Sequence, residues 1–251
     1  MENDIILETV GLTKRFGSFV AVQDVNLKIK EGSIHALIGP NGAGKTTYFN
    51  MLSKFLPATA GKILFRGRDI TSEKPSNVAC RGIVRSFQIS SVFANLTVLE
   101  NVRLSLQRKR GDQYYFWRSE RALDDLNERA VELLRNVDLA AAKSQRAADL
   151  SYGRKRALEL ATTLALEPEI MLLDEPMAGL GSEDIQKVSK LIRASAAGRT
   201  VVMVEHNLKV IEELSDRITV LNRGRVLTEG TYQEVSGSPA VAEAYMGLTN
   251  D

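Results

Sequence analysis

The sequence predicts an α/β protein with a parallel sheet, an N-terminal antiparallel β portion and an inserted α-helical subdomain. Three observations support this class. From residue 170 to residue 221, short apolar runs alternate with helix-like segments, which is the pattern of a parallel sheet connected by helices. Residues 97–166 instead repeat apolar residues every three or four positions, as amphipathic helices do. A glycine-rich stretch, 39–47, joins a short apolar run to a helix-like run.

Local patterns predict the individual elements. Residues 25–30 alternate between apolar and polar side chains, which is typical of a half-buried strand. The predicted strands are 5–10, 25–30, 33–38, 62–65, 170–173, 200–204 and 217–221. The predicted helices are 46–52, 155–166, two that begin at residues 182 and 208, and 238–248. We expect a single domain over 1–251, with 97–166 as the inserted helical subdomain and 238–251 as a C-terminal helix and tail.

Composition narrows the class of protein. With 44% hydrophobic and 25% charged residues, the chain has the composition of a soluble globular protein. No apolar run approaches the ~20 residues that a spanning helix needs, and the polar, acidic start is not a secretory signal. A net charge of +2 is too small to indicate nucleic acid or anionic lipid as a partner. These properties suit a cytoplasmic protein.

Cysteine and histidine are rare in this chain. The single cysteine, Cys80, excludes an internal disulfide and has no partner for a metal cluster, so we expect a small packed side chain. There are two histidines. His35 lies inside a strand pattern and is expected to be a packed residue, whereas His206 follows a predicted strand.

The glycine-rich stretch reads G-P-N-G-A-G-K-T-T and matches the phosphate-binding loop G-x-x-x-x-G-K-[ST] in full. Its glycines let successive backbone N–H groups point at one anion. Lys45 adds a charge for the β- and γ-phosphates, and the Thr46 hydroxyl suits Mg²⁺. We therefore expect a P-loop nucleotide-binding core. The nucleotide-binding candidates are Gly39, Pro40, Asn41, Gly42, Ala43, Gly44, Lys45, Thr46 and Thr47.

Two carboxylates follow the apolar run 170–173, namely Asp174 and Glu175. In a parallel sheet, ligands bind beyond the carboxyl ends of the strands, so these side chains are expected beside the phosphate loop. One carboxylate can serve the magnesium shell while the other orients and deprotonates a water. On its own the pair would be read as a polar turn, but the complete phosphate loop favours catalysis.

Three further positions have weaker signals. Ser151, in L-S-Y-G-R at 150–154, is a natural helix N-cap, and a helix N-terminus near a glycine can bind an anion. His206 could bond a γ-phosphate or steady a water, or be structural. Gln88 could contact the metal shell, although a lone glutamine is usually a surface residue.

These motifs, in this order, closely resemble the ATP-binding subunits of ABC transporters. The likeness runs from about Ile6 to Gly247. Within that family, the chain is most similar to the ATPase subunits of branched-chain amino acid importers. Tyr152, the run D-E-P-M-A-G-L from Asp174, and the tail S-D-R-I-T-V-L-N-R-G ending in A-Y-M-G carry this second resemblance.

The resemblance implies ATP and Mg²⁺ as cofactors and assigns roles to residues. Phe16 would stack on adenine, although an isolated phenylalanine near a turn is usually core. Glu175 would be the general base, and His206 would contact the γ-phosphate. Gln88 would act in catalysis and, with Asp174, serve the Mg²⁺ shell that Thr46 ligates directly. Ser151 and Gly153 would complete the nucleotide site of a second subunit.

Three residues, in two motifs, depart from the family pattern. Arg154 and Lys155 stand where that motif usually has glutamines, and Gly181 stands where an acidic or amide residue is usual. The first change could tighten a closed dimer or face outward. The second puts a hydrogen bond between subunits in doubt. Because the catalytic pair is intact, an active ATPase is still expected.

The aromatic cluster at 114–117 lies between basic residues in the helical region. Exposed aromatics beside arginines suit a protein interface, and in this family the region faces the membrane subunit. Local packing is the alternative, and RNA stacking is a weaker one.

The resulting hypothesis is an ATPase that energises import of a small solute, namely branched-chain or related amino acids. Its expected partners are transmembrane permease subunits, a second ATPase subunit (a copy or a paralogue) and, indirectly, a periplasmic solute-binding protein, with no nucleic acid. Its expected location is peripheral, on the cytoplasmic face of the inner (plasma) membrane. Three alternatives remain open: the ATPase of a lipopolysaccharide-type exporter, a nucleic-acid- or ribosome-associated ABC ATPase, and a non-catalytic nucleotide-dependent scaffold.

Overall fold

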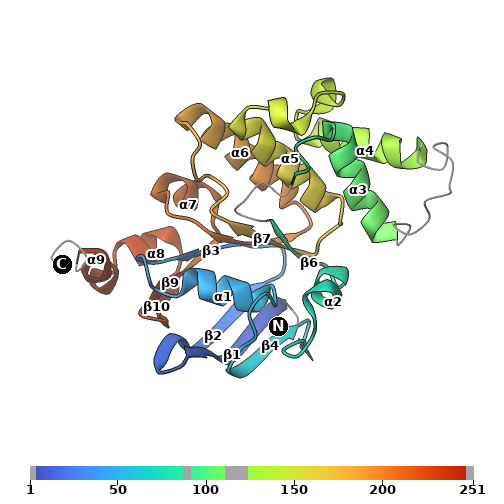
Figure 1. Ribbon diagram of the computed structural model, residues 1–251. Helices are drawn as coiled ribbons and strands as arrows, with labels where there is room; N and C mark the ends of the chain where they lie inside the picture. Colours follow the sequence, from blue (N-terminus) through green and yellow to red (C-terminus); the bar gives the residue numbers. More distant parts are fainter. Residues whose placement is uncertain (1–3, 87–91, 111–123, 247–251) are drawn as a thin grey trace.

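Two β-sheets organise the chain, as the computed structural model in Figure 1 shows. The structure describes residues 4–86, 92–110 and 124–246. The smaller sheet has the strand order β2-β1-β4-β5 and is antiparallel. Its strands are β1 (Ile5–Phe16), β2 (Phe19–Lys30), β4 (Ala60–Phe65) and β5 (Arg68–Asp69).

The larger sheet has six strands in the order β10-β9-β3-β8-β7-β6. All neighbouring pairs from β9 to β6 are parallel, and β10 pairs with β9 in the antiparallel direction. Its strands are β3 (Ile34–Ile38), β6 (Ile83–Ser86), β7 (Ile170–Asp174), β8 (Thr200–Val204), β9 (Arg217–Asn222) and β10 (Arg225–Gly230). The carboxyl ends of β3, β7 and β8 therefore meet at one edge, where a ligand site is expected.

Helices cover both faces of this sheet (Figure 1). Helix α1 (Lys45–Leu52) lies on the face toward the smaller sheet, while α5 (Tyr152–Leu164) and α6 (Ser182–Ser195) lie on the other. Beside α5 lie α3 (Val98–Arg110) and α4 (Asp124–Asn136). The remaining helical segments are α2 (Pro75–Cys80), η3 (Ala140–Ala142), η4 (Ala147–Asp149), α7 (Leu208–Leu214), α8 (Tyr232–Ser236) and α9 (Pro239–Met246).

Strand alternation divides the core into two layers. On β7, Met171 and Leu173 pack with the helices of the α5 face, whereas Ile170 and Leu172 pack with α1 and the smaller sheet. All four side chains are at most 2% exposed. Because successive strand residues point to opposite faces, Asp174 follows on the α1 face. The core thus determines which carboxylate faces the phosphate loop.

The fold class expected from the sequence is confirmed. The predicted strands and helices are present; β1 and β2 extend further than their patterns indicated, and α5 begins three residues earlier and ends two residues earlier than predicted. The sequence patterns missed α2, α8 and the strands β5, β6 and β10. The division into a core and an inserted subdomain stays a prediction.

Three further expectations concern two single side chains and the membrane. His35 is 1% exposed, as predicted for a packed histidine. The prediction for Cys80 was wrong: the side chain is exposed because it ends the short helix α2, of which Val78 forms the buried face. Among the described residues, no helix has the length and apolarity needed to cross a bilayer.

Candidate functional site

The phosphate loop, 39–47, connects β3 to α1 at the carboxyl edge of the six-stranded sheet. Within the loop, Ala43 N donates to Pro40 O over 3.2 Å, and from outside it Gly224 N donates to Ala43 O over 3.0 Å. Residue Gly44 precedes α1 with φ +97°, so the loop enters the helix through a left-handed conformation that favours glycine. The helix N-terminus then opens toward the loop, which suits an anion.

Close packing also requires glycine at both ends of the loop. A Cβ on Gly39 would lie 2.1 Å from the carbonyl oxygen of Leu221, and one on Gly44 would lie 2.5 Å from that of Ala21. Both distances are far below van der Waals contact. The motif glycines thus let β2 and β9 approach the loop and hold its curled shape.

Lys45 begins α1 and folds back over the loop. Its Nζ donates to the backbone oxygens of Gly39 and Pro40 over 2.7 and 2.9 Å. Burial lowers the pKa of Lys45, and the charge of Glu175 opposes that shift. The ammonium therefore lies over the loop with only backbone oxygens as hydrogen-bond acceptors among the described residues.

Asp174 ends β7 and is fully buried, with 0% exposure of its side chain. Its Oδ2 accepts a bond of 2.6 Å from Arg85 of β6. No described group bonds its Oδ1. Arg85 was not identified from the sequence, although an arginine inside the short apolar strand I-V-R-S is a signal that could have been used.

Glu175 and His206 lie at the ends of adjacent strands. The Nε2 of His206 is 2.9 Å from Oε1 of Glu175, and the two side chains are 43% and 28% exposed. Glu175 adopts φ +46°, and its N–H donates to Val204 O over 2.9 Å. This turn directs the carboxylate out of the strand toward the imidazole and the solvent.

Glu205 is a buried carboxylate that supports this pair. Its Oε1 accepts from Met177 N over 2.9 Å, and its Oε2 accepts from the N–H groups of His206 and Asn207 over 2.9 and 3.2 Å. The residue is 4% exposed. It thus ties the loop after β7 to the loop after β8. The sequence showed a polar residue directly after an apolar strand, but no role followed from that alone.

The segment 150–154 begins α5, as predicted. Ser151 caps the helix by accepting from Arg154 N over 3.4 Å, and it is exposed. Gly153 is buried, and a Cβ there would lie 2.6 Å from the carboxylate of Asp184. The structure therefore separates two roles for this helix start: Gly153 lets α6 approach, and Ser151 faces solvent.

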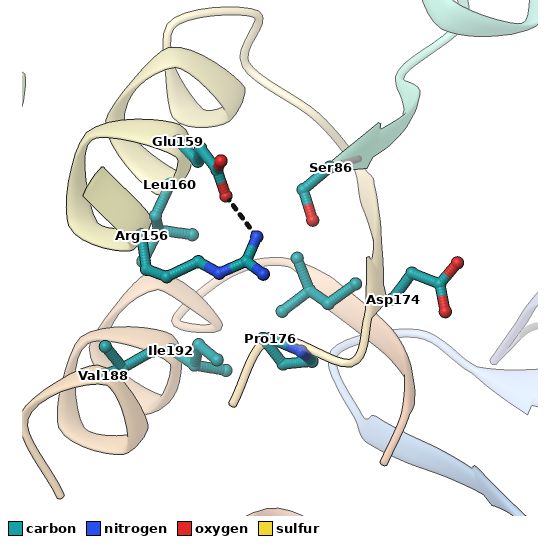
Figure 2. A pocket seen from close by; sticks show the side chains of 9 residues that line it. Ser86, Arg156, Glu159, Leu160, Asp174, Pro176, Val188 and Ile192 are labelled. Carbon is teal, nitrogen blue, oxygen red and sulfur yellow. Dashed lines mark hydrogen bonds and ion pairs between the residues drawn. The ribbon is translucent and has the colours of Figure 1, made fainter. Parts of the chain in front are cut away.

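Figure 2 shows the buried arginine of the same helix. Arg156 Nη1 bonds Oε2 of Glu159 over 2.8 Å, and its guanidinium lies between α5 and the end of β7. Ser86 points toward Arg156, whereas Asp174 points away from it to the other side of its strand (Figure 2). Arg156 Nη2 also bonds the hydroxyl of Tyr152 over 2.9 Å. Both bonds lie within α5, so this network orders the first turns of that helix and does not use Asp174.

Other candidates lie apart or outside the described residues. Phe16 ends β1 and is 49% exposed, with Lys14 Nζ 5.2 Å from its ring centre, so it is not a core residue. Gln88 and the aromatic cluster 114–117 lie outside the described residues. The structure thus brings together the phosphate loop, Asp174, Glu175 and His206, and places Ser151 at a separate exposed helix start.

The chemistry of this arrangement suits a metal-bound phosphate ligand. Oδ1 of Asp174 has no partner in the described part of the chain. It is the kind of buried carboxylate oxygen that accepts from metal-bound water, and oxygen ligands are those that Mg²⁺ prefers. Described residues contain no group of three His, Cys, Asp or Glu side chains arranged for a metal ion. A metal ion here would thus have few protein ligands and would be held largely by oxygens of the bound phosphates, as Mg²⁺ commonly is.

Comparisons with known proteins agree with this geometry. The family model described as ABC transporter matches residues 22–178. The chain is 38% identical to the high-affinity branched-chain amino acid transport ATP-binding protein BraF of Pseudomonas aeruginosa, covering 96% of this chain and 98% of that one. It is 36% identical, over 96% of its own length and 98% of the relative's, to LivG of Escherichia coli, which has the same description.

Solved structures show the same fold. A nucleotide-free ATP-binding cassette from an ABC transporter superposes with a TM-score of 0.83 at 27% identity, covering 96% of this chain and 98% of that one. The ADP conformation of an ATP-binding cassette gives 0.84 at 28% identity, with 97% and 99% covered. From its motifs, its fold and these relatives, the chain belongs to the ABC transporter family, among its ATP-binding proteins.

Proposed function

We propose that this protein hydrolyses Mg²⁺-bound ATP to energise import of branched-chain or related amino acids. The observation that carries the proposal is the 2.9 Å contact between Glu175 and His206, at the strand edge that also carries the phosphate loop. A fold that only bound nucleotide would not need a solvent-facing carboxylate paired with an imidazole. Relatives described as branched-chain amino acid transport ATP-binding proteins support the solute class.

The phosphate loop and its neighbours bind the substrate. Backbone N–H groups of 39–47 and the Lys45 ammonium hold the β- and γ-phosphates. Thr46 would ligate Mg²⁺, and Asp174 would bond its water shell through Oδ1. The ion, when bound, neutralises charge that develops on the phosphates. Gln88 is proposed for the same shell, and the exposed ring of Phe16 is proposed to stack on adenine.

Glu175 acts as the general base. Its carboxylate takes a proton from the water that attacks the γ-phosphorus, while the bond from that phosphorus to the β–γ bridging oxygen breaks. His206 orients this carboxylate through the Nε2–Oε1 contact and is placed to bond a γ-phosphate oxygen. The reaction thus uses positioning and charge, as phosphoryl transfer generally does.

A second copy completes the site. Ser151 is exposed at the start of α5, where free N–H groups and the helix dipole favour an anion. It is proposed, with Gly153, to contact the γ-phosphate held by the other subunit. A dimeric ATP-binding cassette bound to ADP and phosphate, 28% identical to this chain with a TM-score of 0.75 and 90% of this chain covered, supports this arrangement.

A permease is the proposed membrane partner. A groove of about 670 Å³ runs between α2, α3 and the end of α5. Phe55, Phe93 and Leu104 line it with 54%, 61% and 38% exposure, and such apolar surface marks interaction sites. We assign this groove to a cytoplasmic segment of the permease. That contact would hold the protein on the cytoplasmic face of the inner membrane, with a solute-binding protein acting on the other side.

The Glu175→Gln variant tests the catalytic assignment. We expect it to bind ATP as the unchanged protein does and to lose turnover by about 10²- to 10⁴-fold, the usual contribution of a general base. Phosphate release and binding of a fluorescent ATP analogue measure the two properties. The exposed Glu212→Gln change is the matched control. Unchanged turnover in Glu175→Gln would remove Glu175 as the base.

Uptake tests the transport assignment. The subunit is purified from cells with its associated membrane proteins and reconstituted in vesicles with ATP inside. We expect ATP-dependent uptake of radiolabelled leucine, isoleucine or valine, and its loss with Glu175→Gln. Copurification with ribosomes and no membrane protein would instead support a nucleic-acid-associated ATPase.

A further inference from the structure

Arg85 connects three elements of the site from one position on β6. Its Nη2 bonds Oδ2 of Asp174 over 2.6 Å. Its Nη1 bonds Oδ1 of Asn50 over 2.5 Å and Oγ of Ser53 over 3.2 Å. Asn50 lies on α1, one turn after Thr46. A single guanidinium therefore joins the helix that carries Thr46 to the strand that carries Asp174.

Strand register explains how Arg85 reaches this position. Strands β6 and β7 are parallel neighbours, and Arg85 pairs with Leu172. Leu172 packs on the α1 face, as does Ile83, two residues before Arg85. Because side chains alternate between faces, Arg85 and Asp174 both project toward α1. Ser86 projects to the opposite face, toward Arg156 (Figure 2).

Arg85 and Asp174 form a buried ion pair. The side chains of Arg85 and Asp174 are 9% and 0% exposed. Breaking a buried pair by removing one partner is strongly destabilising, because a charge is left uncompensated. The planar guanidinium also presents donors at fixed angles, so it can set the distance between two acceptors. The ring centres of Phe49 and Phe55 lie 5.5 and 5.9 Å from its Cζ and restrict its movement.

The two oxygens of Asp174 are used differently. Oδ2 is held by Arg85, whereas Oδ1 has no partner among the described residues. An arginine bond on one oxygen fixes the plane of the carboxylate and leaves the other oxygen to accept from a metal-bound water. Groups that hold metal-shell ligands in this way commonly control metal affinity.

We propose that Arg85 is a positioning residue for the magnesium site, holding Asp174 and α1 in register so that Oδ1 of Asp174 and the Thr46 hydroxyl serve one ion. The inference rests on the metal-shell role proposed for Asp174. Arg85 also lines the groove assigned to the permease, so its side chain contacts both the docking surface and the magnesium carboxylate.

Metal binding in the presence of ADP tests the role of Arg85 without turnover. Mn²⁺ replaces Mg²⁺ as a paramagnetic probe, and the free-ion resonance is titrated with protein and saturating ADP. In Arg85→Met we expect the Kd for Mn²⁺ to rise about tenfold, the usual size of such effects. Affinity for ADP in EDTA stays unchanged. Arg85→Lys retains the charge but cannot bridge both acceptors, so we expect its Kd for Mn²⁺ to lie between those of the unchanged protein and Arg85→Met.

The direction of the change in Kd for Mn²⁺ distinguishes a positioning role of Arg85 from a purely electrostatic one. Removing a cation beside Asp174 would by charge alone tighten metal binding, because Mn²⁺ would face one more uncompensated negative charge. A weaker affinity in Arg85→Met therefore reports lost position. A tighter or unchanged affinity would overturn the inference.

Two further measurements keep the test decisive. Asn50→Ala removes the acceptor on α1 and leaves the pair of Arg85 with Asp174, so it replaces Arg85→Met if that variant does not fold. We expect the Kd for Mn²⁺ to rise by less than in Arg85→Met. An unchanged Kd would overturn the inference. Asp174→Asn tests the underlying assignment. If Asp174→Asn binds Mn²⁺ as the unchanged protein does, the metal role of Asp174 fails, and the positioning role fails with it.

Discussion

The Nε2 of His206 lies 2.9 Å from Oε1 of Glu175, across 31 residues of sequence. Strands β7 and β8 are parallel neighbours, and Asp174 pairs with Val204. Glu175, the first residue after β7, and His206, the second after β8, therefore leave the sheet close together. The contact exists because two separate strands end at the same level.

His206→Ala removes the imidazole from this contact. We expect turnover to fall about 10²-fold, at the lower end of contributions from groups that assist proton transfer, because Glu175 loses the partner that orients it. Binding of a fluorescent ATP analogue changes much less. Phosphate release measures turnover, and Leu208→Ala is the control, since Leu208 lies two residues away and is 55% exposed. Equal losses in both variants would contradict a specific role for His206.

Glu205→Gln weakens the hydrogen bonds that join the loops carrying Glu175 and His206. The carboxylate accepts three backbone N–H groups, and an amide has one oxygen and places its NH₂ against a donor. We expect the free energy of unfolding to fall by about 2 kcal/mol, since hydrogen bonds to buried charged groups contribute 1.5–3 kcal/mol. Urea unfolding measures this. The exposed Glu212→Gln change is the matched control, and an equal stability of the two variants would rule out this role.

Gly153→Ala tests the packing of α5 against α6. The new Cβ would lie 2.6 Å from the Asp184 carboxylate, so we expect a loss of about 1 kcal/mol or more, the range for overpacking. Gly181→Ala is the control, because no heavy atom lies within 4 Å of a Cβ there.

A double variant isolates the cause of that loss. In an Asp184→Ala background the obstruction is gone, and alanine favours a helix over glycine by up to about 1 kcal/mol. Gly153→Ala should then stabilise the protein. Thermal unfolding of the four proteins in this cycle gives the coupling. A loss of the same size in both backgrounds would show that Asp184 is not the obstruction.

His35 makes stability depend on pH. Its Nε2 lies 2.8 Å from Oγ1 of the buried Thr219. Burial, with a smaller contribution from Arg217, lowers its pKa from 6.5 to about 4. The folded state therefore prefers the neutral ring, and stability falls as the pH drops from 6.5 toward 4. Between pH 7 and pH 5 we expect a loss of roughly 2 kcal/mol.

Urea unfolding of His35→Gln at the same two pH values provides the comparison. Glutamine can keep a hydrogen bond to Thr219 and does not titrate in this range, so the difference between the two proteins isolates the histidine. The unchanged protein should lose more stability than the variant between pH 7 and pH 5. Equal losses would mean that His35 does not cause the dependence.

Local patterns predicted most of the fold. The apolar run 170–173 and the helix that begins at Ser182 were identified because their periodicities differ and their lengths suit each element. Strand β6 was missed because Arg85 and Ser86 interrupt a four-residue strand, I-V-R-S. Strand β10 is an edge strand with mostly polar residues, so it has little apolar signal. Cys80 was expected to be packed because its residue type is usually buried, but its place at the end of a short exposed helix decided otherwise.

Contiguous motifs predicted part of the candidate site. The phosphate loop is one run of nine residues, and its geometry is local, so the sequence was sufficient to identify it. Arg85 and Glu205 were not identified, because each joins segments that are distant in sequence: Arg85 bonds Asp174, and Glu205 bonds Met177 in addition to the two residues that follow it. A single arginine or glutamate has no pattern that reveals such a contact.

Sequence alone was enough to establish the α/β class, the phosphate loop and the order of the polar residues that follow the strands, since these depend on short-range periodicity and on backbone conformations that only glycine adopts readily. The tertiary structure decided which of those residues meet. Parallel pairing of β7 with β8 brings Glu175 to His206, and strand alternation turns Arg85 and Asp174 to one face while Ser86 faces Arg156. Register and burial are properties of the packed sheet, and no local stretch of the chain contains them.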